Sequence, residues 1–505
     1  MTLRVYNTLS KQKELFQPVK PGEVGMYVCG PTVYKPPHMG HLVGPVIFDA
    51  VKRYLQYKGF KVTWIVNITD VDDKLIVEAA NQNTTVSQIA ERCTKDYLDV
   101  LAMLGIDTID RFPKASEHIG EIIALIEKLI AKDHAYAADG NVWFAVGSDS
   151  DYGKLSHRNT EEQEAGTRDL EGSGKRSGAD FALWKAAKPG EPMWDSPWGR
   201  GRPGWHIECS AMSMKYLGES FDLHGGGMDL LFPHHENELA QSESASDKPF
   251  VKYWMHNGLT RVATKTPGGQ TEYVKESKSL GNIRDARKFI GEHGADFVRY
   301  LLLSTHYRSP IDFSEEVMAS TKKGQQKFQR LFERIERLGG QLQAEKGDDM
   351  DRASGALLET SHAAYARAVL TLKVKFLEAM DDDFNTAGAI AALHEMAGEV
   401  NGFIERNELE KSRTPELLTA ATAGAQSVKN LGAVLGLFNA KLAAAGAVAG
   451  QADPLPGQLM QLVIGLRAEL RKAKNFALAD QLRKDLTAIG ITLEDRADGT
   501  IWRRE

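Results

Sequence analysis

The stretch from Met26 to Val66, MYVCGPTVYKPPHMGHLVGPVIFDAVKRYLQYKGFKVTWIV, decides the fold. It begins with a short apolar run that reads as a buried strand and is closed by the turn Gly30-Pro31. Apolar residues then recur at helical spacing from Val43 to Leu55, and Gly59 ends this pattern before a second apolar run, Lys61 to Val66. Strand, helix and strand in this order predict an α/β fold. We expect a parallel sheet with a right-handed crossover and a ligand crevice at the carboxyl ends of its strands.

The composition is that of a globular, multidomain chain. Its 505 residues exceed what one hydrophobic core usually organises, and 42% hydrophobic with 26% charged residues exclude a disordered, fibrous or membrane chain. The sequence has neither a secretory signal pattern nor a long uncharged apolar run, so we expect a cytoplasmic protein. A net charge of -6 excludes a generally basic nucleic-acid binder but allows local basic patches.

Other segments follow the first unit in a clear order. Helical patterns recur early and again throughout the second half, separated by a stretch rich in glycine, tryptophan and charge that reads as an insertion. A Gly/Lys/Ser-rich stretch reads as a mobile loop, and an Ala/Gly-rich stretch with two prolines suits a linker before a compact terminal module. These segments are the helices 86–104 and 118–132, the insertion within 141–202, the loop 264–282, the helical region 297–438 and the linker 439–457.

The sequence His38-Met-Gly-His41 opens the first helix, where backbone N–H groups and the helix dipole favour a phosphate. Gly40 removes the Cβ that would keep a flat base from the backbone, so adenine could lie there. The alternative is a pair of surface histidines after a Pro-Pro turn.

A second cationic motif is Lys275-Glu-Ser-Lys278-Ser-Leu-Gly-Asn282. Two mobile ammonium groups could close on a triphosphate as negative charge develops on pyrophosphate. The alternative is a solvated basic loop.

Metal-ligand residue types recur around two further motifs, Gly204-Trp-His-Ile-Glu-Cys209 and Phe232-Pro-His-His-Glu-Asn-Glu238. Pro233 can occupy the first position of a helix, which places His234 and Glu238 at i and i+4 on one face. With Cys209 and the strand-end Cys29 they would form a Cys₂/His/Glu set suited to zinc. The alternative is that both cysteines are small buried residues and that His234 and Glu238 lie on a helix surface. The spacing alone does not decide between this alternative and a metal site. Cys93, inside a helical pattern, reads as a core residue.

Taken together, these motifs and Asn67-Ile-Thr-Asp-Val-Asp-Asp-Lys74, in this order and spacing, closely resemble the cysteinyl-tRNA synthetase family of class I aminoacyl-tRNA synthetases. The resemblance covers essentially the whole chain. It implies a Rossmann catalytic domain with a connective insertion, a stem-contact region carrying the Lys-Ser-Lys-Ser loop, a helical bundle and an anticodon-binding module. The implied boundaries are 1–135 and 203–260 for the catalytic domain, 136–202 for the insertion, 261–319 for the stem-contact region, 320–438 for the bundle, 439–457 for the linker and 458–505 for the terminal module.

The resemblance also implies roles for individual residues. Cys29, Cys209, His234 and Glu238 look like the zinc ligands, one ion per chain. Residues of the two cationic motifs and one aspartate look like the ATP site, with the histidines and lysines also stabilising the transition state: His38, Gly40, His41, Asp229, Lys275 and Lys278. Three residues look like neighbours of the substrate cysteine: Thr69, Trp205 and His224. The family usually has isoleucine where Met39 stands and methionine where Glu276 stands, and Glu276 adds a negative charge to a cationic loop.

The implied reaction has two steps: ATP, with Mg²⁺, activates L-cysteine to cysteinyl-adenylate, and tRNA(Cys) then takes the acyl group. Because a metal distinguishes a thiolate from a hydroxyl, we expect no editing domain. Residues 320–337 carry six Lys/Arg against two Glu, and Trp502 precedes two arginines, so both are candidate RNA contacts. The alternatives are a solvated helix face and a frayed tail. We expect a monomer. The alternatives are a mycothiol-pathway ligase that joins cysteine to an amino sugar and, more distantly, a noncatalytic zinc-containing RNA-binding protein.

Overall fold

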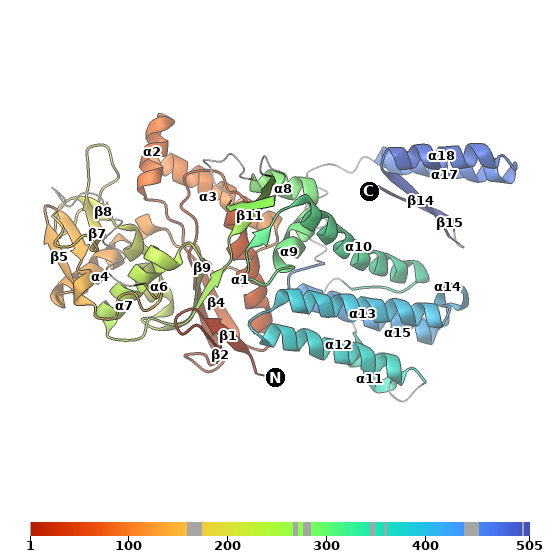
Figure 1. Ribbon diagram of the computed structural model, residues 1–505, viewed down its shortest axis with the longest axis horizontal. Helices are drawn as coiled ribbons and strands as arrows, with labels where there is room; N and C mark the ends of the chain where they lie inside the picture. Colours follow the sequence, from red (N-terminus) through yellow and green to blue (C-terminus); the bar gives the residue numbers. More distant parts are fainter. Residues whose placement is uncertain are drawn as a thin grey trace. The chain divides into compact units, whose positions relative to one another are not determined.

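The computed structural model describes residues 2–158, 174–265, 271–275, 284–343, 349–357, 361–438, 454–496 and 499–504 (Figure 1). The chain divides into two compact units, Met1–Ala443 and Ala444–Glu505. Among the described helices, none combines the length and apolar character that a membrane crossing requires.

A four-stranded parallel sheet forms the centre of the first unit. Its strand order is β10-β9-β3-β4, and every neighbouring pair is parallel. The strands are β3 (Glu23–Val28), β4 (Lys61–Val66), β9 (Phe221–Gly227) and β10 (Val251–Asn257). The helix between β3 and β4 is α1 (Gly40–Tyr57), so the predicted strand–helix–strand unit is confirmed. Both faces of this sheet are covered, which explains the nearly continuous apolar runs in its strands.

Glycine lets α1 approach the sheet closely. A Cβ at Gly225 on β9 would lie 2.1 Å from Cζ of Phe48, a fully buried α1 residue. A Cβ at Gly226 would lie 2.7 Å from Cε1 of His235. The glycine run after His224 therefore serves close packing of a helix and a histidine ring on the sheet.

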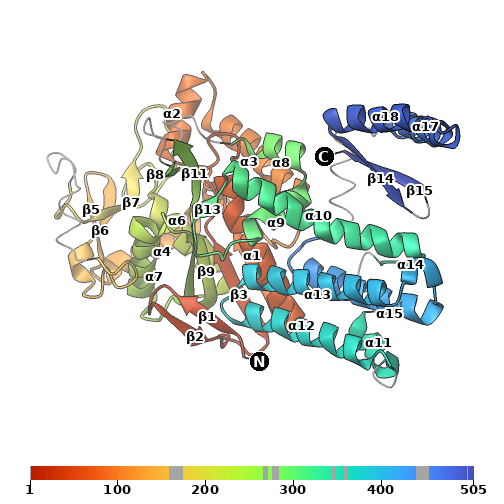
Figure 2. The same ribbon diagram turned by 45° about the vertical axis from the view of Figure 1, so that its right-hand side comes forward.

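A second sheet is inserted between β4 and β9 in the sequence. Its order is β5-β6-β7-β8, all antiparallel, and it lies on the side of the central sheet away from the helical region (Figures 1 and 2). It has a hydrophobic core that includes Phe144, Leu183 and Trp184. The strands are β5 (Ala135–Ala138), β6 (Asn141–Phe144), β7 (Phe181–Ala186) and β8 (Gly201–Pro203).

Helices and short strands surround these sheets. The predicted helices 86–104 and 118–132 appear as α3 and α4, and Cys93 is buried in the core as expected. These elements are β1 (Arg4–Asn7), β2 (Gln12–Leu15), α2 (Asp73–Asn81), α3 (Val86–Met103), α4 (Ile119–Ala131), α6 (Trp205–Leu217), α7 (Glu236–Ser246), α8 (Ala286–His293) and α9 (Ala295–Leu303).

The interpretation of 264–282 as a mobile loop is wrong for part of its length. Strand β11 (Thr260–Lys265) pairs antiparallel with β12 (Thr271–Lys275), and five consecutive residue pairs form a regular ladder from Arg261–Lys275 to Lys265–Thr271. Strand β11 also pairs with β13 (Ile311–Asp312). Residues 266–270 and 276–283 lie outside the described residues.

The helical region that follows is confirmed. Helices α12, α13 and α15 lie side by side in both views (Figures 1 and 2). The helices are α10 (Glu315–Leu338), α11 (Met350–Leu357), α12 (Ala363–Asp381), α13 (Thr386–Arg406), α14 (Leu409–Ser412) and α15 (Pro415–Val434). On α10, Lys322, Lys323, Lys327 and Arg330 are exposed, whereas Arg334 is paired with Glu405 and Glu410.

The second unit has a small core of its own. It consists of α17 (Pro454–Lys472), α18 (Phe476–Ala488) and the hairpin β14 (Ile491–Arg496) and β15 (Gly499–Arg504). Trp502 lies opposite Leu493 in the hairpin and packs, partly buried, against this core. Residues 439–453, which contain most of the expected linker, lie outside the described residues, and the domain boundaries stay predictions.

Candidate metal centre and nucleotide site

Four potential metal ligands converge at the carboxyl end of β3. The Cys29 Sγ lies 3.7 Å from the Cys209 Sγ, 3.5 Å from the His234 Nε2 and 3.5 Å from the Glu238 Oε1. The His234 Nε2 lies 2.9 Å from the same Glu238 oxygen. All four ligand atoms lie within 4.8 Å of one another, and three of the residues are buried. Cys29 is partly exposed and marks the open side of this donor set.

The local chain path that presents His234 and Glu238 differs from the expected one. The two side chains do share a face at i and i+4, as predicted. However, the chain is kinked within Leu231–His235, and α7 begins only at Glu236, three residues after Pro233. Phe232 before it is extended (φ -140°, ψ 133°), and the Phe232–Pro233 peptide is cis. The assigned helix α7 therefore begins three residues later than predicted, although Phe232 is the last residue with a non-helical backbone before it.

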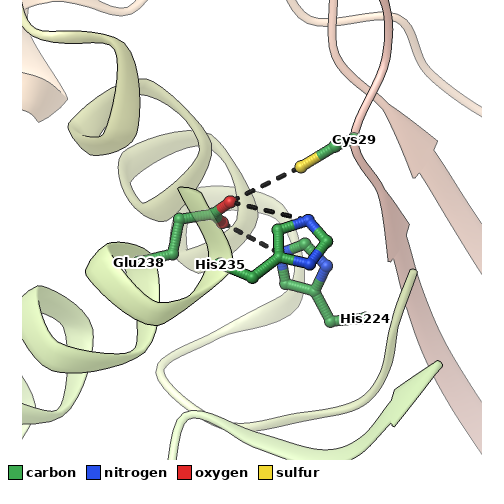
Figure 3. A group of neighbouring side chains, drawn as sticks. All are labelled: Cys29, His224, His235 and Glu238. Atoms are coloured by element: carbon green, nitrogen blue, oxygen red, sulfur yellow. Dashed lines mark hydrogen bonds and ion pairs between the residues drawn. The ribbon is translucent and has the colours of Figure 1, made fainter. Parts of the chain in front are cut away.

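Glu238 belongs to a second group of ligand-type side chains, shown in Figure 3. Its Oε2 lies 2.9 Å from the His224 Nε2, and its Oε1 lies 4.0 Å from the His235 Nε2. Both groups use Cys29 and Glu238, so they cannot each hold an ion at once. The group with Cys209 offers two sulfur ligands, and soft thiolates favour zinc. In this arrangement His224 is not a metal ligand and instead contacts the Oε2 of Glu238.

The side chains behind His234 fix its orientation. The His206 Nδ1 lies 3.0 Å from the His234 Nδ1, which leaves the His234 Nε2 facing the thiols. The indole ring of Trp205 stacks on the His234 imidazole, with centroids 4.2 Å apart and planes at 25°. Metal-binding histidines are commonly held in this way through the other ring nitrogen. These residues therefore fit a zinc ion.

Charges in the donor set are strongly coupled. Burial disfavours a charge on each group, but the Glu238 carboxylate and Cys209 outweigh it and raise the pKa of His234 to about 10. Burial also disfavours the charge of Glu238, but His224 and His234 outweigh it and hold the pKa of this carboxyl well below its usual range. Burial and the neighbouring Cys209 raise the pKa of the Cys29 thiol. A metal ion bound by both sulfurs would displace their thiol protons.

Three further histidines surround this set and were not singled out from the sequence. The His235 Nδ1 lies 2.8 Å from the His256 Nε2, and the His256 Nδ1 lies 2.9 Å from the Thr8 Oγ1. Burial lowers the pKa of His206, His235 and His256, the last to about 3, so all three stay neutral at physiological pH. His235 stands beside a predicted ligand in the sequence, which was an available signal, whereas no spacing pointed to His256.

The start of α1 lies near the end of the same strand β3. The helix begins at Gly40, so the prediction that the His38–His41 motif opens it is confirmed. The two imidazoles stack with centroids 3.8 Å apart, and both side chains are half-buried. A Cβ at Gly40 would lie 3.0 Å from the His38 Cε1. The absence of a side chain at Gly40 therefore leaves room for the His38 ring beside the first turn of α1.

The structure describes some of the other predicted site residues but not all of them. Thr69 follows β4, is buried, and its hydroxyl accepts a hydrogen bond from the Asn67 Nδ2 at 3.2 Å. Asp229 is exposed in the turn after β9. Lys275 ends β12 but its side chain lies outside the described residues, as do Glu276 and Lys278.

A cavity of about 650 Å³ separates the inserted sheet from this site. Trp205 and His206, which contact His234, form one wall, and Trp143, Lys175 and Lys185 of the insertion line the other. The carboxylates of Asp72, Asp73 and Asp180 line it as well, and Lys185 is paired with Asp73 at 2.9 Å.

The segment 152–156 of the insertion is hydrogen-bonded to α7, the helix that carries Glu238. Both oxygens of Glu236 accept main-chain hydrogen bonds, from Gly153 at 3.0 Å, Leu155 at 3.3 Å and Ser156 at 2.6 Å. The Tyr152 hydroxyl also donates to Asn237. Helix α7 therefore links the donor set to the insertion.

The fold and this site together define a class of protein. Two solved structures share the fold: Mycobacterium tuberculosis methionyl-tRNA synthetase in complex with methionyl-adenylate (16% identity, TM-score 0.55, 88% of this chain and 94% of that one) and the ternary complex of Agrobacterium radiobacter LeuRS (13%, 0.57, 85% and 87%). The family model described as tRNA synthetases class I (C) catalytic domain matches residues 15–323, and a DALR domain model matches residues 375–439. The chain is a class I aminoacyl-tRNA synthetase.

Curated relatives specify the family. Cysteine–tRNA ligases of Geobacter sulfurreducens and Heliobacterium modesticaldum are 44% and 45% identical, each over 100% of both chains. The ligase of Pyrococcus horikoshii is 43% identical over 100% of this chain and 99% of its own. The chain belongs to the cysteine–tRNA ligase family, which confirms the resemblance found in the sequence. The mycothiol-pathway and noncatalytic alternatives are not favoured.

Proposed function

We propose that this enzyme activates L-cysteine with ATP and transfers the cysteinyl group to the 3′ end of tRNA(Cys). The observation that carries the proposal is the position of a buried Cys₂/His/Glu donor set beside the start of α1. One feature suits a thiol and the other a nucleotide, and both lie where β3 ends.

We propose one zinc ion per chain, held by Cys29, Cys209, His234 and Glu238. When bound, zinc supplies a soft partner that takes the substrate thiol as a thiolate and discriminates against a serine hydroxyl, whose pKa is much higher. Cys29 is the partly exposed member of the set, so the substrate side chain approaches beside it. A specific hetero-atom contact of this kind can discriminate by about 10⁴ or more, so the enzyme needs no editing site.

We propose the remaining substrate contacts on the same basis. Trp205 covers His234 and orients it, while His224 holds Glu238, so both act on the cysteine side chain through the donor set. The buried Thr69 hydroxyl accepts from Asn67 and keeps its own proton to donate to the substrate. These contacts position the cysteine carboxylate for attack on the α-phosphate of ATP.

We assign ATP, accompanied by Mg²⁺, to the start of α1. His38 and His41 stabilise charge on the phosphates at the positive end of the helix dipole, and Gly40 admits the base. Asp229, Lys275 and Lys278 complete the assignment carried over from the family. A Lys278→Ala variant tests this part: kcat for adenylate formation should fall, and unchanged pyrophosphate exchange would refute it.

The tRNA would contact several surfaces. The cavity beside Trp205 suits an unpaired 3′ nucleotide, because its walls offer aromatic rings for stacking. The exposed lysines of α10 suit the RNA backbone, and Trp502 with its following arginines suits the anticodon. We further propose a monomer that acts in the cytoplasm.

The test is cysteine-dependent ATP–pyrophosphate exchange and charging of tRNA(Cys), each with the zinc-loaded and the chelator-treated chain. We expect cysteine to support exchange, serine to be about 10⁴-fold poorer, and zinc to restore what chelation removes. Full exchange in the metal-free chain would refute the metal assignment. Absence of cysteine-dependent exchange in the zinc-loaded chain would refute the function.

A further inference from the structure

Tyr27 is a buried polar residue at the donor set that has no role in the assignments above. It lies on β3, two residues before Cys29, and is 0% exposed. Among the described residues, its phenol oxygen has no hydrogen-bond partner. A buried hydroxyl without an acceptor is costly, so an acceptor is expected within its reach.

The surroundings of Tyr27 identify that acceptor. Its ring meets the His224 imidazole edge-on, with centroids 5.2 Å apart, and it shares a hydrophobic cluster with Cys29 and Cys209. Burial, followed by Cys209, Cys29 and Glu238, raises the pKa of the phenol well above its ordinary value. The hydroxyl therefore lies among members of the donor set, of which Cys209 acts on it most strongly.

The two sulfurs lack a donor from outside the set. Among the described side chains, the contacts of the Cys29 Sγ go to Cys209, His234 and Glu238, all of them would-be ligands. Once both thiols lose their protons to a metal, each sulfur can only accept a hydrogen bond. The phenol beside Cys209 is then a neutral donor without an acceptor, next to a thiolate without an outside donor.

We infer that Tyr27 donates its phenolic hydrogen bond to the Cys209 thiolate and is a positioning residue for recognition of the substrate thiol. This inference rests on the proposed function. Two thiolates and one carboxylate already outweigh the two positive charges of a zinc ion, and a substrate thiolate adds a further negative charge. A hydrogen bond to sulfur withdraws electron density from it, so the ion keeps more capacity to accept the substrate. Tyr27 thus favours cysteine binding more than metal retention.

The test is Tyr27→Phe in the full chain, loaded with Co²⁺ in place of zinc. We expect cobalt to bind, with the sulfur-to-cobalt absorption band at lower energy than in the unsubstituted chain. In zinc-loaded enzyme, the KM for cysteine should rise about tenfold while the KM for ATP stays constant, since outer-shell partners are typically worth about 10- to 100-fold. Tyr97→Phe is the matched control, because Tyr97 is equally buried on α3 in another hydrophobic cluster.

Each outcome decides the inference. An unchanged band energy and an unchanged KM for cysteine in Tyr27→Phe would overturn it, and so would outright loss of cobalt. If Tyr27→Phe does not fold, site-specific 3-fluorotyrosine at position 27, a stronger donor, must shift the band to higher energy and lower the KM. If cysteine leaves the cobalt spectrum of the unsubstituted chain unchanged, the proposed metal function fails instead.

Discussion

The donor set and the start of α1 both lie at the end of β3, yet they are built in opposite ways. His234 and Glu238 are buried, and each is held by a neighbour, His206 at 3.0 Å and His224 at 2.9 Å. His38 and His41 are half-buried and stack mainly on each other. The site that would read the amino-acid side chain is thus preorganised in the core. The site that would hold ATP is a half-exposed helix end.

The largest effect is expected for a change in the buried donor set. In Cys209→Ser we expect metal affinity and cysteine activation to fall by about 10³ or more, because discrimination through one hetero-atom contact can reach about 10⁴–10⁵. Metal content and pyrophosphate exchange measure this. Cys93→Ser is the control, because Cys93 is a buried thiol in a different cluster, and its metal content should not change. Equal metal loss in both variants would contradict the assignment.

A change at the half-exposed start of α1 should affect adenylate formation without affecting metal binding. We expect His41→Asn to lower the rate of adenylate formation by about 10²–10³-fold, the usual effect of removing a group that stabilises transition-state charge. Zinc content should be unchanged, because His41 contacts no member of the donor set. Single-turnover adenylate formation and metal analysis check both parts, and loss of zinc would show that the two sites are not independent.

A smaller effect tests how far the rigid region extends. Glu236→Gln places an amide N–H₂ against main-chain donors of 153–156, so we expect amide exchange in this segment to accelerate about tenfold, for a cost of about 1–2 kcal/mol. Metal content should persist, because Glu238 keeps its own partners.

The matched control for that variant is Asp222→Asn. Asp222 is also buried and accepts main-chain hydrogen bonds, from Val19 at 2.5 Å and Gly25 at 2.7 Å, but it lies near the amino end of the inner strand β9. It should leave exchange in 153–156 unchanged. Hydrogen exchange measured by mass spectrometry distinguishes the two, and equal acceleration in both would argue against a specific link through α7.

The smallest effect expected is at Gly40. An alanine Cβ there would meet the His38 ring at 3.0 Å, so the ring must shift by a few tenths of an ångström, and we expect the KM for ATP to rise about threefold. Gly44→Ala, one turn later, meets only ordinary contact at 3.6 Å and should leave the KM for ATP unchanged. Both changes favour a helix by about 1 kcal/mol, so stability does not separate them. An equal KM for both variants would remove the steric role of Gly40.

The sequence alone predicted the parallel β3–α1–β4 unit, the helix start at the His38 motif and the family of the enzyme. The first two inferences rest on neighbours in the chain, where apolar periodicity and glycine positions determine local structure. The family rests on the resemblance of several motifs in their order and spacing. The same reasoning placed the start of α7 three residues too early, since the kink at Phe232 depends on what packs around it. It also failed at residues 271–275, which gain strand structure only by pairing with β11.

The tertiary structure alone decided that the four ligand types meet. Cys29 and Cys209 are 180 positions apart, and nothing in their local spacing fixes the 3.7 Å between their sulfurs. The same holds for His256 and Tyr27, which lie on strands β10 and β3 and join the site only when the sheet forms. Spacing along a chain specifies which residues share a helix or strand face. Contacts between distant segments depend on how whole elements pack, and that is determined by the free energy of the complete fold.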